Sequence, residues 1–238
     1  MWWSFCAAKD GVGTSTIVAA VALELAKSQP ELTVVIADFG GDQPELFGID
    51  VAGRPGVTDW LHAGSDAPIE ALDNVVFDAA PGVVVLPVGQ SQLHQADPTR
   101  VVRLAEGFGP RTLVVADLGV MGRWPTDPRA LLAAGGSTTT LVTRACYLGL
   151  RRAAKLPISF GSVVEVCEPG RSLKTLDVEL VLGQPMTARV RVDPMIARAV
   201  DAGMLTSRLP RPLRRVASKL IGTVVDDVQR VPSFGAVS

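Results

Sequence analysis

A glycine-rich run at residues 7–16 carries the most specific chemical pattern in the chain. It reads AAKDGVGTST, follows an apolar run at residues 2–7, and leads into an apolar helical pattern that starts at Ile17. Strand, glycine loop and helix are the layout of a phosphate-binding loop. Glycines turn backbone N–H groups inward, and the helix start adds free N–H groups and a positive dipole end. The run therefore predicts a binding site for a phosphate group.

One position in this run departs from the usual pattern, G-x-x-x-x-G-K-[ST]. That pattern places a lysine directly before the hydroxyl residue that binds Mg²⁺. Here Thr14 stands at the lysine position, and Ser15 and Thr16 supply the hydroxyls. Backbone N–H donors do not depend on the lysine side chain, so we expect phosphate binding to survive this change better than catalysis does.

Two apolar runs elsewhere end in a carboxylate. Residues 33–38 read TVVIAD and residues 112–117 read TLVVAD, so Asp38 and Asp117 close two predicted buried strands. Ligands of an open parallel sheet bind at the C-terminal ends of its strands. We therefore expect both carboxylates at the same sheet edge as the glycine loop, with Asp117 placed to help hold Mg²⁺. Each could instead only cap the loop that follows it.

The remaining chain alternates between strand-like and helix-like segments, which favours right-handed βαβ units. We predict one α/β domain of three layers, built on a mainly parallel, doubly wound sheet of seven or eight strands. Its further strands are expected at residues 75–77, 83–88, 139–143, 162–167 and 187–192. Its helices are expected at residues 17–28, 57–62, 99–106, 128–134, 148–155, 172–182, 194–202 and 210–224.

Composition agrees with a large core and narrows the class. The chain has 238 residues, of which 47% are hydrophobic and only 5% aromatic, and its mean hydropathy is +0.30. Its three cysteines show neither metal nor disulfide spacing. We see no signal peptide and no apolar run of the roughly 18 residues that a membrane span needs. A cytoplasmic protein is expected.

Charge is unevenly distributed along the chain. Residues 1–143 hold eight Lys and Arg against 16 Asp and Glu, whereas residues 144–238 hold 15 against eight. A basic second half can mark an anionic partner such as DNA. The alternative is that the two halves neutralise each other within the fold.

The glycine loop resembles the deviant Walker A motif, K-G-G-x-G-K-[ST], of the MinD/ParA group of P-loop ATPases. Lys9 matches the signature lysine of that group, Asp10 replaces its first glycine, and Thr14 replaces its second lysine. The resemblance continues through VVIAD, VVVLP and VVAD, which end at residues 38, 87 and 117, and through LGQP at 182–185. It implies a P-loop NTPase domain over residues 1–225, followed by a disordered tail at 226–238. The nearest branch is the actinobacterial CpaE/TadZ-like one, which is linked to pilus assembly and septum placement.

The resemblance also implies a set of site residues. ATP and Mg²⁺ would sit on the loop between two subunits that close face to face, and each Lys9 would reach the phosphates of the other subunit. Ser15 or Thr16 would hold Mg²⁺ together with Asp117. The expected nucleotide contacts are Lys9, Asp10, Gly11, Val12, Gly13, Thr14, Ser15, Thr16 and Asp117. Arg144 follows a predicted strand and could also face the nucleotide.

Two departures from the group point to weak or absent hydrolysis. Thr14 lacks the cation of the lysine, and Gly40 lacks the carboxylate that hydrolytic members place near the attacking water. Asp38 or Asp42 could substitute for that carboxylate, and Lys9 and Asp38 are the candidate catalytic residues. We predict a homodimeric positioning or assembly factor that binds a protein partner, possible settings being pilus or septum machinery. The alternatives are a slow but active ATPase, a DNA-binding partition protein and a nucleotide-free scaffold.

The last predicted helix has an apolar stripe formed by Leu213, Val216, Leu220 and Val224. Such a stripe is typical of a peripheral membrane anchor, but also of a helix that packs on its own domain. Arginines and lysines occupy the other positions, which leaves a DNA-binding surface as a further interpretation.

Overall fold

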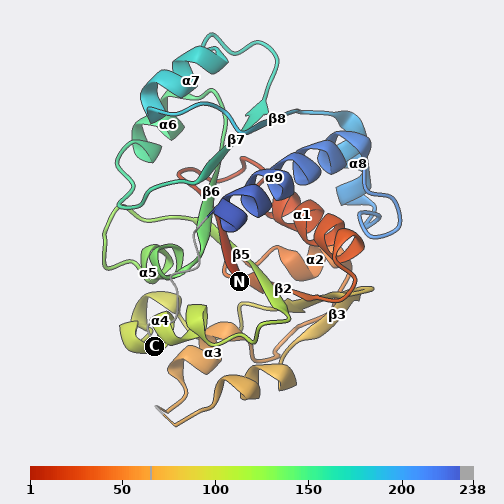
Figure 1. Cartoon of the computed structure of the whole chain (residues 1–238), viewed down its shortest axis with the longest axis vertical. Helices are drawn as coiled ribbons and strands as arrows, with labels where there is room; N and C mark the ends of the chain where they lie inside the picture. Colours follow the sequence, from red (N-terminus) through yellow and green to blue (C-terminus); the bar gives the residue numbers. More distant parts are fainter. Residues whose placement is uncertain (65, 231–238) are drawn as a thin grey trace.

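Among residues 1–64 and 66–230, which the computed structural model describes, eight strands form one sheet (Figure 1). The strand order is β3-β4-β2-β5-β1-β6-β7-β8, and every neighbouring pair is parallel except the antiparallel pair β3 and β4. The strands are β1 (Trp2–Ala7), β2 (Thr33–Asp38), β3 (Phe77–Ala80), β4 (Val83–Leu86), β5 (Thr112–Val120), β6 (Thr138–Thr143), β7 (Ser162–Cys167) and β8 (Ala188–Arg191). The predicted mainly parallel α/β fold is confirmed.

Helices cover the sheet and begin where local chemistry predicts. Asp97, Asp127 and Asp193 each accept a hydrogen bond from a backbone N–H group of the first turn, and each precedes a proline at the first helical position. The helices are α1 (Thr14–Ser28), α2 (Gln43–Phe47), α3 (Val57–His62), α4 (Pro98–Glu106), α5 (Pro128–Gly135), α6 (Tyr147–Ala153), α7 (Thr175–Leu182), α8 (Pro194–Asp201) and α9 (Arg211–Arg230). Two short 3₁₀ helices, Ile69–Asn74 and Leu93–Gln95, were not predicted.

The central strand β1 is buried on both faces and separates two hydrophobic cores. Trp3 and Phe5 point to one face, into the core formed with α1 and α9. Trp2 and Cys6 point to the opposite face, into the core formed with α3 and α4. This alternation follows from the two-residue period of a strand. The loop that follows β1 therefore starts from a strand that is buried on both faces.

The last helix packs on the domain itself. Leu213, Val216, Leu220 and Val224 are all buried, and α9 lies along α1 and β8 (Figure 1). The apolar stripe that suggested a membrane anchor is therefore used within the fold. The helix also continues to Arg230, six residues beyond its predicted end at 224, so the start of the predicted tail is helical. The rest of that tail, residues 231–238, lies outside the described residues.

The four tryptophans lie in two contrasting environments. Trp2, Trp3 and Trp60 are buried, and each indole N–H donates a hydrogen bond, to Ser4 Oγ, Thr140 Oγ1 and the Pro68 carbonyl respectively. Trp124 lies in the loop between β5 and α5 and is 71% exposed. No helix within the described part of the chain is long and apolar enough to cross a membrane.

We predict that Leu220→Ala lowers the free energy of unfolding by about 2–5 kcal/mol, because it leaves a cavity between α9 and α1. Lys219→Ala, a change at the neighbouring exposed position, should stay within about 0.5 kcal/mol of wild type. Urea unfolding followed by circular dichroism measures both. Equal stability of the two variants would contradict the packed position of α9.

Candidate functional site

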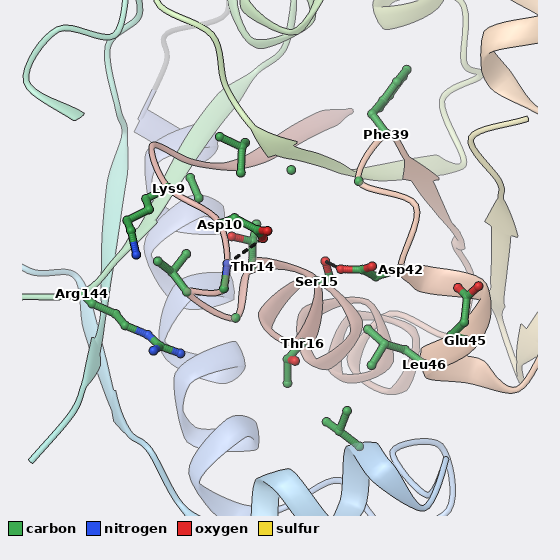
Figure 2. Close-up of a pocket in the computed structure, with 18 of the residues that line it drawn as sticks. Lys9, Asp10, Thr14, Ser15, Thr16, Phe39, Asp42, Glu45, Leu46 and Arg144 are labelled. Carbon is green, nitrogen blue, oxygen red and sulfur yellow. Dashed lines mark hydrogen bonds between the residues drawn. The ribbon is translucent and has the colours of Figure 1, made fainter. Parts of the chain in front are cut away.

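The glycine loop forms one wall of an open cleft of about 710 Å³ (Figure 2). It connects β1 to α1, with Gly11 and Gly13 in the left-handed region at φ 71° and 93°. A side chain is disfavoured at both positions because L-residues rarely adopt these angles. The cleft is within the size range of small-molecule sites. The structure thus builds the cradle that the sequence predicts, at the C-terminal edge of the sheet.

The loop side chains differ in how they are used. Lys9 and Asp10 are exposed, and Asp10 Oδ1 accepts a hydrogen bond of 2.6 Å from the backbone N–H of Gly11. Thr14 is 7% exposed, and within the described residues its Oγ1 has no hydrogen-bond partner. Residues 9–16 all line the cleft, so the structure brings the predicted loop residues together.

Asp38 lies behind the cleft wall and is not one of its lining residues. Its side chain is fully buried and accepts hydrogen bonds from the backbone N–H groups of Gly40, Gly41 and Gln43, at 3.0, 2.7 and 3.1 Å. Burial, followed by the neighbouring Asp117, raises the pKa of Asp38 to about 7 despite these bonds. This arrangement favours a role in holding the loop after β2 over the predicted catalytic role.

Asp117 is the partner of Asp38 in the register between β5 and β2. It is also fully buried, and its carboxylate accepts hydrogen bonds from the Gly119 backbone at 3.0 Å and from Gln43 Nε2 at 2.7 Å. Burial raises the pKa of Asp117, and hydrogen bonds from Gln43 and Ser15 oppose that rise. Like Asp38, Asp117 is not one of the residues that line the cleft.

Gln43 is the functional residue that sequence reasoning missed. Its buried amide Nε2 donates to the Ser15 carbonyl at 3.1 Å and to Asp117, and its backbone N–H donates to Asp38. It thereby links the glycine loop, the end of β2 and the end of β5. Its type carried no signal for this role, since a glutamine after a glycine turn is ordinarily an exposed helix-start residue.

A side chain at position 40 would contact Asp117 tightly. A Cβ placed on Gly40 would lie 3.3 Å from Asp117 Oδ1. The candidate substitute Asp42 is exposed and lines the cleft, where its Oδ2 accepts a hydrogen bond of 3.2 Å from Ser15 Oγ (Figure 2). Of the two carboxylates considered as replacements, Asp42 is the one that faces the cleft.

The residues of the cleft fit a phosphate better than they fit a free metal ion. No cluster of three or more metal-ligating side chains occurs in residues 1–64 and 66–224, whose side chains the structure describes. Mg²⁺ commonly binds through one or two protein groups plus the phosphates of its substrate. Ser15 lines the cleft and can supply one such group, whereas Asp117 does not line it. The unpartnered Thr14 hydroxyl, the two left-handed glycines and the start of α1 suit a phosphate group.

Acidic groups outnumber basic ones among the described residues that line the cleft. The acids are Asp10, Asp42, Glu45 and Asp201, and the bases are Lys9, Arg129 and Arg144. Arg129 is the most constrained of these bases, because its Nε donates to the Leu118 carbonyl at 2.8 Å. Lys9 and Arg144 are therefore the more available sources of positive charge for a phosphate chain.

No protein-family model and no curated protein sequence matches the chain, but solved structures match its fold. A ParA family ATPase from Chlorobium tepidum is 20% identical with a TM-score of 0.68, and covers 97% of this chain and 98% of its own. The septum site-determining protein MinD of Pyrococcus horikoshii, complexed with Mg-ADP, is 18% identical with a TM-score of 0.70, over 100% and 99%. MinD in a MinC:MinD complex from Aquifex aeolicus is 12% identical with a TM-score of 0.71, over 100% and 99%. At these identities the likeness establishes the fold alone.

The Asp38 carboxyl predicts a pH dependence of stability. Its raised pKa means that the folded state binds the proton more tightly than the unfolded state, whose pKa is about 3.9. The free energy of unfolding should therefore fall as pH rises from about 4 to about 7, by up to about 1.4 kcal/mol per unit from this group. Asp38→Asn should have a shallower slope in urea unfolding measured over this range. Identical slopes for the two proteins would contradict the buried acid pair.

Proposed function

We propose that this protein binds ATP on the loop at residues 9–16, hydrolyses it slowly or not at all, and acts as a positioning or assembly factor. The observation that carries the proposal is the loop itself. It presents the backbone of a phosphate cradle while the buried Thr14 occupies the position of the usual lysine. The MinD/ParA fold of the matching structures supports this assignment.

The expected weakness of hydrolysis follows from two groups. A hydrogen bond to a charged group contributes about 1.5–3 kcal/mol, and a cation at the transferring phosphoryl group contributes more in the transition state. Thr14 supplies no such cation. Gly40 supplies no carboxylate to orient water, and Asp38 is held behind the wall by three backbone N–H groups.

A homodimer is the proposed working form. Lys9 is exposed at the mouth of the cleft, where it can contact the phosphates of a second copy facing it. The Aquifex aeolicus protein was solved as a complex of MinD with MinC, which supports a protein partner for this fold. A pilus or septum system of the CpaE/TadZ type is the process that we propose, on the resemblance of the motifs.

We expect wild type to bind Mg-ATP in isothermal titration calorimetry with little phosphate release. Gly13→Ala should weaken binding by about tenfold or more, because it strains a backbone that must turn its N–H groups inward. Gly53→Ala is the matched control, since Gly53 is also left-handed, at φ 68°, but lies away from the cleft. An equal loss in both variants would point to general strain instead of a phosphate cradle.

The rival functions give different results in the same assays. Phosphate release that Lys9→Ala abolishes would favour a genuine slow ATPase. If wild type does not bind ATP at millimolar concentration, a nucleotide-free scaffold would be the function that remains.

DNA binding is the second candidate function, and one surface favours it. The face of α9 turned away from the domain carries Arg211, Arg215 and Lys219, all exposed. Cations that contact DNA phosphates release counterions on binding, which makes affinity depend steeply on salt. Arg214 is less available because it lies 3.9 Å from Glu24.

We expect a double charge reversal, Arg215→Glu with Lys219→Glu, to abolish any retention of the protein on random duplex DNA at low salt. The double change Glu31→Gln with Asp50→Asn, at exposed acids outside α9, serves as a control that should retain binding. Retention that survives the reversal would remove α9 as the DNA surface.

A further inference from the structure

Arg144 is the strongest candidate for the positive charge that the glycine loop lacks. It follows β6, and β6 is the parallel neighbour of β1 with Cys6 opposite Leu141. Lys9 and Arg144 are each three residues beyond that pair. The register of the sheet therefore delivers both side chains to the same flank of the loop. Figure 2 shows them extending on this flank, across the loop from Ser15 and Asp42.

The guanidinium of Arg144 has unused hydrogen-bonding capacity. Its side chain is 27% exposed, and its one ion pair is a loose one, with Nη1 3.7 Å from Glu168 Oε1. Its Nε is buried and has no hydrogen-bond partner among the described residues. A buried donor left unpaired costs free energy, so a rotation of the guanidinium that brings Nε to an acceptor in the cleft would remove this cost.

Glu168 is held mainly by another arginine. Arg171 donates to Glu168 Oε2 from both Nε and Nη2, with Nε at 2.6 Å. This pairing above all, with smaller effects of Arg144 and Lys9, lowers the pKa of Glu168. Because Arg171 satisfies the carboxylate, Arg144 can turn from Glu168 to a phosphate without leaving an unpaired acid behind.

Arg144 lines two neighbouring cavities, as do Lys9 and residues 10–12 of the loop. It lines the main cleft, and it lines a smaller pocket of about 210 Å³ that includes Lys9, Cys146 and Arg171. Arg171 lines only the smaller pocket. An arginine presents a planar fork of donors that matches phosphate oxygens and keeps its charge at all relevant pH values.

From this geometry we infer that Arg144 binds the phosphate chain of the nucleotide within its own subunit and replaces the missing loop lysine. The inference rests on the proposed ATP-binding function and adds to it the source of the charge. Arg144, which follows β6, then supplies the positive charge that a lysine at position 14, at the start of α1, would otherwise supply.

The test compares Arg144 with an exposed arginine of α6, Arg152, which lines neither cavity. Calorimetric titrations of Mg-ATP and of inorganic tripolyphosphate are run on wild type, Arg144→Gln and Arg152→Gln at one ionic strength. We expect Arg144→Gln to weaken the binding of both probes by about 10- to 100-fold. Arg152→Gln removes the same charge outside the cleft and should change the affinities by no more than about twofold.

A second experiment tests whether a lysine at position 14 can take over the role of Arg144. Thr14→Lys returns the ammonium group to the loop, so the double variant Thr14→Lys with Arg144→Gln should regain most of the lost affinity. A double variant as weak as Arg144→Gln alone would overturn the shared role. Should Arg144→Gln fail to fold, Arg144→Lys against Arg152→Lys replaces it, and a loss confined to the first variant is then expected.

The failures of the two proposals are distinguishable. If wild type and Arg144→Gln bind Mg-ATP with equal affinity, the role of Arg144 is overturned and the proposed function stands. Wild type that binds neither probe at millimolar concentration overturns both.

Discussion

One buried amide, that of Gln43, joins the three segments that make the cleft. It donates to Ser15 and Asp117, while the backbone N–H of the same residue donates to Asp38. Asp38 and Asp117 are adjacent buried carboxyls that disfavour each other's ionisation. Without Gln43 this acid pair would lose donors that compensate its burial, and the loops after β2 and β5 would lose their tie to the glycine loop.

Shape and charge are separable in this site. The shape comes from left-handed glycines, the start of α1 and the network around Gln43, none of which requires the cation that Thr14 lacks. The positive charge comes from Lys9, at the start of the loop, and from arginines outside the loop. The backbone donors and the charged side chains of such a site are supplied by different residues. A protein can therefore lose the side chains that hydrolyse a nucleotide and keep a loop that binds phosphate.

The sequence predicted the strands, the helices and the glycine loop well, because each of them depends on residues that are close together in the chain. The bounds of β2 and α3 match the predicted ranges. The parts that it missed are contacts between distant residues, such as Gln43 with Asp117, 74 positions apart. The direction of Asp38 could not be predicted either. A carboxylate at the end of a strand can turn toward the cleft or toward the following loop, and only the N–H groups of that loop decide between them.

The three buried tryptophans and the exposed Trp124 give the protein two separate fluorescence signals. Three indoles are enclosed, two of them in the central strand, so their emission reports the integrity of the sheet. The fourth, Trp124, is in water in the loop that follows β5, the strand that carries Asp117. A water-soluble quencher reaches this indole and spares the others. Events at the C-terminal edge of the sheet can thus be followed by fluorescence, apart from unfolding, without an attached dye.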